Sequence, residues 1–268
     1  MIITLTVIAV IFSAYVLALR GRTNHPDINK LRNWHYAHRG LHGNGIPENS
    51  MAAFQKAVEK GYGVELDVHL LSDGNLAVIH DASLKRTANA DIKIETLTTQ
   101  QLQDYRLEET QEQIPTLRAV LDLVAGKVPM IIELKSEDDN YTALTEAASR
   151  MLAEYEGLYC IESFDPRCIR WLRKHQPHII RGQLSYNSLR NGPAVSYWLR
   201  FLMTNLLSNF WNRPDFIAYC YSDRKRLSVH ISRKLWKIQG VAWTLRAAGD
   251  FDNSVKENWI PIFEGFEP

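Results

Sequence analysis

The sequence predicts an α/β fold, a (β/α)8 TIM barrel preceded by an N-terminal transmembrane helix. Three observations predict it: short apolar runs alternate with helical patterns, an uncharged segment opens the chain, and 268 residues with 46% hydrophobic content can bury one large core. Single domains of this length are common among α/β barrels. We therefore expect a transmembrane anchor over residues 1–20, a juxtamembrane linker over 21–33 and a barrel domain over 34–268.

The first 19 residues, MIITLTVIAVIFSAYVLAL, carry no charge and have nearly the length of a membrane-spanning helix, which needs about 20 apolar residues. No Lys or Arg precedes the run, as a secretory signal would require, and four basic residues follow it at Arg20, Arg22, Lys30 and Arg32. This charge bias predicts a single-pass protein with its barrel on the cytoplasmic side of the bilayer. The alternative is a cleaved signal peptide.

The strands of the barrel are predicted from apolar runs bounded by turn residues. Only the five residues LSDGN join the second run to the third, too few for a parallel crossover, so these two form an antiparallel hairpin with Asp73-Gly74 in its turn. The other eight runs supply the barrel, with helices such as the segment that begins after Ser50 between them. The nine predicted strands are residues 35–39, 64–70, 76–80, 129–135, 158–164, 179–184, 216–221, 241–245 and 260–264.

Two segments exceed the needs of a simple barrel. Residues 82–115 are long enough to cover the mouth of the active site. Residues 186–213 are apolar and aromatic, which indicates either core packing or an interfacial contact with the membrane. Residues 160–240 hold 14 Lys and Arg against 4 Asp and Glu, a surplus of ten that indicates either a surface facing phosphate groups or an acidic bilayer, or a set of solvated arginines. We expect no nucleic-acid partner.

The stretch VELDVHL places polar side chains on one face of a strand. Successive side chains alternate, so Glu65, Asp67 and His69 point into the barrel, where carboxylates are costly unless they are paired or bound to a metal. In MIIELK, Glu133 and Lys135 share a face in the same way. Carboxylates without a thiolate or a pair of imidazoles favour Mg²⁺ or Ca²⁺. The alternative is a buried ion-pair network without metal.

Two histidines occupy the ends of predicted strands, where functional residues of such barrels lie. In HYAHRG, His38 is a candidate general acid or base and Arg39 a candidate phosphate clamp. In IHD, Asp81 can fix the tautomer of His80 or raise its basicity. Two histidines beside a divalent cation form an acid and base pair suited to phosphoryl chemistry. The alternative for each histidine is a surface position or a satisfied place in the core.

The motifs HRG, PENS, ELD, SDGNLAVIHD, IELK, SFDP and WT occur in this order, and the sequence from roughly residue 35 to 268 resembles the glycerophosphodiester phosphodiesterase family. The resemblance implies a metal-dependent barrel that hydrolyses glycerophosphodiesters to glycerol 3-phosphate and an alcohol, through attack by a glycerol hydroxyl and a cyclic phosphate that water opens. The implied roles are acid and base for His38 and His80, metal ligands for Glu65, Asp67 and Glu133, phosphate contacts for Arg39 and Lys135, and pocket lining for Trp243.

The resemblance also bears on two further acids. Glu48 of PENS is expected to support the metal or the first loop. Glu264 stands where many family members carry an aspartate, and we expect a structural consequence more than a loss of chemistry. The apolar start and residues 186–213 leave open a second substrate class, membrane lysophospholipids cleaved in the manner of a lysophospholipase D. A third interpretation is a catalytically silent, membrane-bound scaffold.

Overall fold

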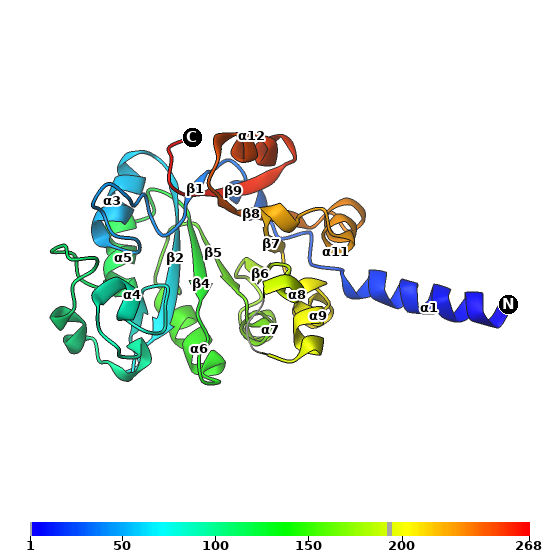
Figure 1. The fold of residues 1–268 in the computed structure, drawn as a ribbon, viewed down its shortest axis with the longest axis horizontal. Coiled ribbons are helices and arrows are strands. Elements are labelled where there is room, and N and C mark those ends of the chain that lie inside the picture. The colour runs from blue at the N-terminus through cyan, green and yellow to red at the C-terminus, as the bar shows by residue number, and fades with distance from the viewer. Residues whose placement is uncertain (1, 192–194) are drawn as a thin grey trace.

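The computed structural model describes residues 2–191 and 195–268, so Met1 and the middle of the segment 186–213 lie outside the described residues. Eight parallel strands form a closed barrel in the order β1-β9-β8-β7-β6-β5-β4-β2, and pairing of β1 with β2 closes it (Figure 1). This confirms the predicted (β/α)8 fold. The eight strands are β1 (Tyr36–Ala37), β2 (Gly63–Leu70), β4 (Met130–Leu134), β5 (Tyr159–Ser163), β6 (Arg181–Ser185), β7 (Phe216–Cys220), β8 (Gln239–Leu245) and β9 (Trp259–Phe263).

The ninth strand, β3 (Leu76–Val78), pairs antiparallel with β2, as the short connection predicted. The turn between them uses Gly74 in the left-handed region, with φ of 82°, a conformation that glycine adopts without strain. The Asp73 carboxylate accepts a hydrogen bond from the backbone N–H of Asn75 and closes the turn. Asp73 and Gly74 therefore form the predicted hairpin turn.

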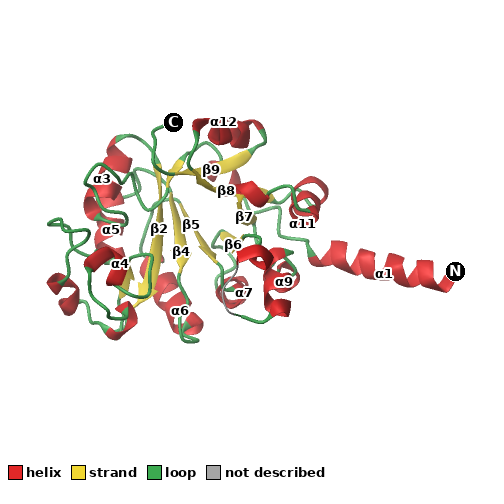
Figure 2. Cartoon of the chain, in the orientation of Figure 1, coloured by secondary structure: helices red, strands yellow, loops and turns green. Residues whose placement is uncertain are grey.

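Helices lie around the outside of the strands (Figure 2). The hydroxyl of Ser50 accepts a hydrogen bond from the N–H of Ala53 and caps the first barrel helix, as predicted. The α-helices are α1 (Ile2–Ala18), α2 (Ile28–Leu31), α3 (Met51–Glu59), α4 (Lys85–Ala88), α5 (Leu117–Val124), α6 (Tyr141–Leu152), α7 (Pro166–His175), α8 (Ser188–Asn191), α9 (Tyr197–Thr204), α10 (Asn209–Asn212), α11 (Leu227–His230) and α12 (Ala248–Lys256). The 3₁₀ segments are η1 (Ile94–Thr96), η2 (Gln100–Asp104) and η3 (Tyr221–Asp223), and η4 (Ile231–Leu235) is a π-helical turn.

Alternate residues of the strands build two cores. Leu66 and Ile132 pack with Phe54 of α3 in the layer between strands and helices. Ile131 and Phe216 belong to a second cluster that fills the inside of the barrel. Because this interior is filled by side chains, the polar residues of the site rest on a packed apolar floor.

The helix α1 extends away from the barrel (Figure 1), and none of its residues is buried. Over residues 2–191 and 195–268, no helix combines the length and the apolar character needed to cross a membrane. At 1.5 Å per residue the 17 residues of α1 reach about 26 Å, against about 30 Å of hydrocarbon in a bilayer. The predicted membrane-spanning helix is therefore not confirmed.

Residues 21–33, which we expected to form a linker, pack against the barrel. Ile28 and Leu31 of α2 are buried and join the cluster inside the barrel, where the hydroxyl of Tyr36 donates to the carbonyl of Leu31. Arg22 forms an ion pair with Asp215, the residue before β7. The buried positions are spaced as on one face of a short helix, a pattern too brief to stand out in the sequence.

Candidate active site

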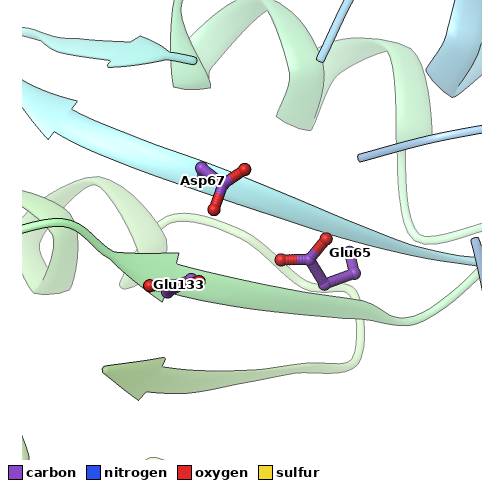
Figure 3. A group of neighbouring side chains, drawn as sticks. All are labelled: Glu65, Asp67 and Glu133. Atoms are coloured by element: carbon purple, nitrogen blue, oxygen red, sulfur yellow. The ribbon is translucent and has the colours of Figure 1, made fainter. Parts of the chain in front are cut away.

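Three carboxylates meet inside the barrel. Glu65 and Asp67 come from β2 and Glu133 from the neighbouring strand β4 (Figure 3), and the strand register places Asp67 directly beside Glu133. All three side chains are buried, and one ligand oxygen from each lies within 4.8 Å of the others. Hard oxygen donors at this separation, without a thiolate among them, fit a Mg²⁺ or Ca²⁺ ion.

The ionisation of the three acids is unequal. Burial, followed by the charges of Asp67 and Glu133, raises the pKa of Glu65 well above its ordinary value. Burial likewise raises the pKa of Glu133 to about 7. Burial also opposes the charge of Asp67, but Lys135 and other nearby positive groups outweigh it and lower the pKa of Asp67. A divalent cation at this place would relieve the repulsion and allow all three acids to ionise.

A fourth buried carboxylate, Glu162 of β5, escaped the sequence analysis. Its strand register places it beside Glu133, and burial, followed by the charge of Glu133, raises its pKa well above the ordinary value. The signals in the sequence were its place on the inward face of the predicted strand 158–164 and its position directly before the motif SFDP. Glu162 adds a fourth inward-pointing acid to the site.

The two predicted phosphate contacts lie against the acids. The Nζ atom of Lys135 is 3.0 Å from Oδ1 of Asp67 and 2.8 Å from Oε1 of Glu133. The guanidinium of Arg39 pairs with Glu48 at 2.9 Å and with Asp67 at 3.4 Å. Glu48 therefore holds Arg39 in place. Of the two roles expected for Glu48, this contact fits support of the first loop rather than support of the metal.

Each histidine of the predicted pair is held by a carboxylate at Nδ1. His38 Nδ1 lies 2.6 Å from Glu264, and His80 Nδ1 lies 2.6 Å from Asp81. A carboxylate accepts the Nδ1–H, so the Nε2 atom of each ring is the proton acceptor. Burial lowers the pKa of both His38 and His80 below the ordinary value, which keeps both rings neutral near pH 7.

Two further residues position this site. The Nδ2 amide of Asn49 donates to Oδ2 of Asp67 at 2.8 Å. His69, placed by strand alternation on the same face as the acids, is bound at Nδ1 by Glu95 and at Nε2 by the carbonyl of His80. His69 therefore ties the strand β2 to the end of the hairpin and supports His80 from behind.

The predicted residues surround one pocket of about 320 Å³. Seven of them line it, and the eighth, Asp67, contacts Lys135 and Arg39 in its wall. No residue of 82–115 is among the lining residues, so the pocket gives no support to the possibility that this segment covers its mouth. Its apolar residues form a separate cluster against the hairpin. The lining includes His38, Arg39, Glu65, His80, Glu133, Lys135 and Trp243, together with Glu162 and Phe164.

Residues 38–217 match the model of the Glycerophosphoryl diester phosphodiesterase family. The chain belongs to this family. The matched region contains the three acids of β2 and β4, both histidines and the phosphate contacts Arg39 and Lys135. Glu264 and Trp243 lie beyond it.

Two curated relatives and one solved structure show the extent of the likeness. A glycerophosphodiester phosphodiesterase from Caldanaerobacter subterraneus subsp. tengcongensis is 36% identical over 158 residues, 55% of this chain and 65% of the relative. A lysophospholipase D from Rattus norvegicus is 32% identical over 135 residues, 46% of this chain and 41% of the relative. The chain thus spans less than two thirds of either relative.

The solved structure is a phosphodiesterase from Oleispira antarctica in complex with the product sn-glycerol-3-phosphate. It aligns with a TM-score of 0.71 at 22% identity and covers 86% of this chain and 92% of that one. At this identity the alignment shows a shared barrel fold.

Proposed function

We propose that the chain hydrolyses glycerophosphodiesters to glycerol 3-phosphate and an alcohol, with Mg²⁺ or Ca²⁺ held by Glu65, Asp67 and Glu133. The observation that carries the proposal is the convergence of these acids in one pocket with two histidines whose Nδ1 atoms are each held by a carboxylate. Membership of the family supports the reaction class. The product bound to the Oleispira antarctica relative supports the substrate class.

The side chains of the pocket have different roles in this reaction. Arg39 and Lys135 bind the non-bridging oxygens of the phosphate, and a well-placed contact of this kind stabilises a transition state by about 3 kcal/mol. One Nε2 atom, of His38 or of His80, removes the proton of the attacking glycerol hydroxyl. The other ring acts in its protonated form: its Nε2 atom first takes a proton from solvent and then delivers it to the leaving alkoxide. The new phosphorus–oxygen bond gives a cyclic phosphate as the bond to the alcohol breaks, and water then opens the ring.

The cation would supply charge neutralisation at the phosphate oxygens. The residues of this chain supply everything else: Glu162 and Phe164 shape the pocket beside the acids, and Asn49 orients Asp67. Trp243 adds an aromatic side chain to the lining and packs against Phe164.

The proposal is tested by release of glycerol 3-phosphate from glycerophosphocholine. His38→Ala and Asp67→Ala should each abolish release, and a chelator should do the same to the wild type until Mg²⁺ or Ca²⁺ is restored. The matched control is His230→Ala, a histidine outside the pocket, which should retain full turnover. Release that survives both substitutions and the chelator would end the proposal.

A second candidate function keeps the chemistry and changes the substrate to a lysophospholipid. The observation that favours it is an apolar cavity of about 840 Å³ beside the catalytic pocket, with Phe164 in the lining of both. A relative from Rattus norvegicus carries the name lysophospholipase D. Turnover of lysophosphatidylcholine compared with glycerophosphocholine distinguishes the two functions.

We further propose that α1 attaches the chain to a bilayer, with the barrel on the cytoplasmic side. Nine of the large apolar side chains on this helix are exposed, a surface that soluble proteins rarely present. The basic residues Arg20 and Arg22 follow it, which supports the orientation. Flotation with vesicles tests the attachment: the full chain should float, and a chain starting at Arg20 should stay at the bottom. Equal behaviour of both chains would contradict it.

A further inference from the structure

A second cavity, of about 840 Å³, lies between the start of α7 and the segment that carries α8, α9 and α10. Its volume falls in the range of small-molecule sites. Unlike the catalytic pocket, it has a lining without a buried cluster of charges. The apolar part of its lining consists of Phe164, Pro166, Val195, Leu199, Met203 and Trp211. We call this cavity the α9 groove.

The α9 groove adjoins the catalytic pocket. Phe164 lines both, and its ring packs edge-on against Trp243 of the catalytic pocket and Tyr186 of the groove, with centroids 5.7 and 5.8 Å apart. The rings of Tyr186 and Trp243 are 6.3 Å apart and complete an aromatic group at the boundary. A long substituent on a substrate with its phosphate at the acids would reach the groove by passing Phe164.

Several polar groups in the wall of the groove are already bound within the protein, whereas the Oγ atom of Ser136 has no hydrogen-bond partner among the described residues. The hydroxyl of Ser185 donates to the carbonyl of Met203, and that of Ser188 donates to the carbonyl of Arg200. Arg200 in turn donates from Nε to the carbonyl of Ser188, and Arg167 pairs with Asp165. These four residues already have hydrogen-bond or ion-pair partners and do not need a polar ligand. By contrast, the apolar side chains of Leu199 and Trp211 are 43% and 54% exposed.

We propose that the α9 groove binds the acyl chain of a lysoglycerophospholipid substrate. This inference rests on the proposed hydrolysis at the catalytic pocket. That chemistry needs a free glycerol hydroxyl as nucleophile, and a glycerophospholipid with one acyl chain keeps such a hydroxyl, whereas a diacyl lipid does not. The pocket then holds the glycerophosphate part and the groove holds the hydrocarbon part of the same molecule.

The first experiment measures kcat/KM for lysophosphatidylcholines of increasing acyl length, each kept below its critical micelle concentration. Burial of each added methylene should raise kcat/KM by roughly two- to fourfold until the groove is filled. Diacyl phosphatidylcholine should not react. Values that do not change with acyl length would overturn the proposal.

Matched variants locate the acyl chain. Leu199→Glu puts a charge in the groove and should lower kcat/KM for a long-chain lysophosphatidylcholine by about 10- to 100-fold, while glycerophosphocholine turnover stays within about twofold. Leu202→Glu changes a leucine of the same helix that is 40% exposed and lies outside the groove, and it should leave both substrates unaffected. Trp211→Ala and Phe210→Ala, with exposures of 54% and 56%, form a second pair.

Each alternative has its own outcome. If α9 only docks on a bilayer, Leu199→Glu and Leu202→Glu will both weaken turnover on vesicles and neither will affect monomeric substrate, which contradicts an acyl site. If the proposed hydrolysis itself fails, no substrate reacts, yet binding of a fluorescent lysophospholipid ether can still be followed by anisotropy. Weaker binding to Leu199→Glu than to Leu202→Glu supports the groove, and equal binding overturns it.

Discussion

The Nδ1 atom of His38 lies 2.6 Å from a carboxylate oxygen of Glu264, a residue 226 positions further along the chain. Arg246 pairs with the same carboxylate at 2.9 Å. His80 has an equivalent arrangement, with Asp81 at Nδ1 and Arg86 behind that carboxylate at 2.6 Å. Each histidine is therefore oriented by an acid that an arginine keeps in place, which fixes Nε2 as the atom available for proton transfer.

The first prediction concerns Glu264. Glu264→Gln can offer an N–H to Nδ1 and so stabilise the wrong tautomer of His38, and we expect kcat for glycerophosphocholine to fall about 10²- to 10³-fold with little change in KM. Steady-state kinetics provide the measurement. The control is Glu267→Gln, which removes a surface ion pair with Lys60 and should leave kcat unchanged. Equal kcat values in the two variants would contradict the role of Glu264 in orienting His38.

Glu264 also predicts a pH dependence of stability. Although burial disfavours its charge, contact with His38 and Arg246 lowers the pKa of Glu264 to about 2 from an ordinary 4.5. A depressed carboxyl pKa contributes stability above the unfolded value, and this contribution is lost as the pH falls through the folded value. The stability advantage of wild type over Glu264→Gln, measured by urea unfolding, should therefore shrink between about pH 5 and pH 3. A stability advantage that stays constant over that pH interval would contradict the lowered pKa of Glu264.

A third prediction concerns the cation. Added Mg²⁺ or Ca²⁺ should raise the free energy of unfolding of the wild type, by about 2.7 kcal/mol at a concentration near 100 times Kd. Glu133→Gln removes one of the three ligands and should lose most of this gain. Asp138→Asn, an exposed residue paired with Lys93, should keep it. Thermal unfolding over a cation titration measures the effect, and an unchanged Tm in the wild type would count against a metal site.

A fourth prediction contrasts two buried acids in chelator. Asp67→Asn removes the charge that Lys135 and Arg39 share, and we expect a loss of about 3 kcal/mol in the free energy of unfolding. Glu162 has no ion-pair partner among the described residues, and burial, then the charge of Glu133, raises its pKa well above the ordinary value, which favours its neutral form. Glu162→Gln should change stability by less than about 1 kcal/mol. Urea unfolding measures the free energy of unfolding of both variants. Similar losses would contradict the assignment of a charged Asp67 and a neutral Glu162.

Local rules predicted the strands. Period-two alternation, turn residues at Asp73-Gly74 and the shortness of LSDGN together indicated nine strands and the antiparallel place of β3, because each signal depends only on neighbours in the chain. The same alternation, combined with a closed barrel, brought Glu65, Asp67 and Glu133 together. Where a feature depended on strand period alone, the sequence was sufficient.

Features that depend on long-range packing were missed. The contact between His38 and Glu264 requires β1 to pair with β9, which only barrel closure supplies. Glu162 is the one acid within its strand β5, and although it directly precedes the motif SFDP, no second acid at period two marks it as part of the site. The length of 82–115 indicated an extra segment, but the direction in which it packs follows from its apolar contacts with the hairpin.

Residues 19–31 join α1 to the barrel through buried and ion-paired side chains. Leu19 is fully buried and Arg22 is paired with Asp215, so the chain contacts the barrel directly after α1 ends. A protein held on a loose tether can tumble freely about its point of attachment. Here the end of α1 packs on the barrel instead, so a surface that bound this helix would also set the direction in which the catalytic pocket opens.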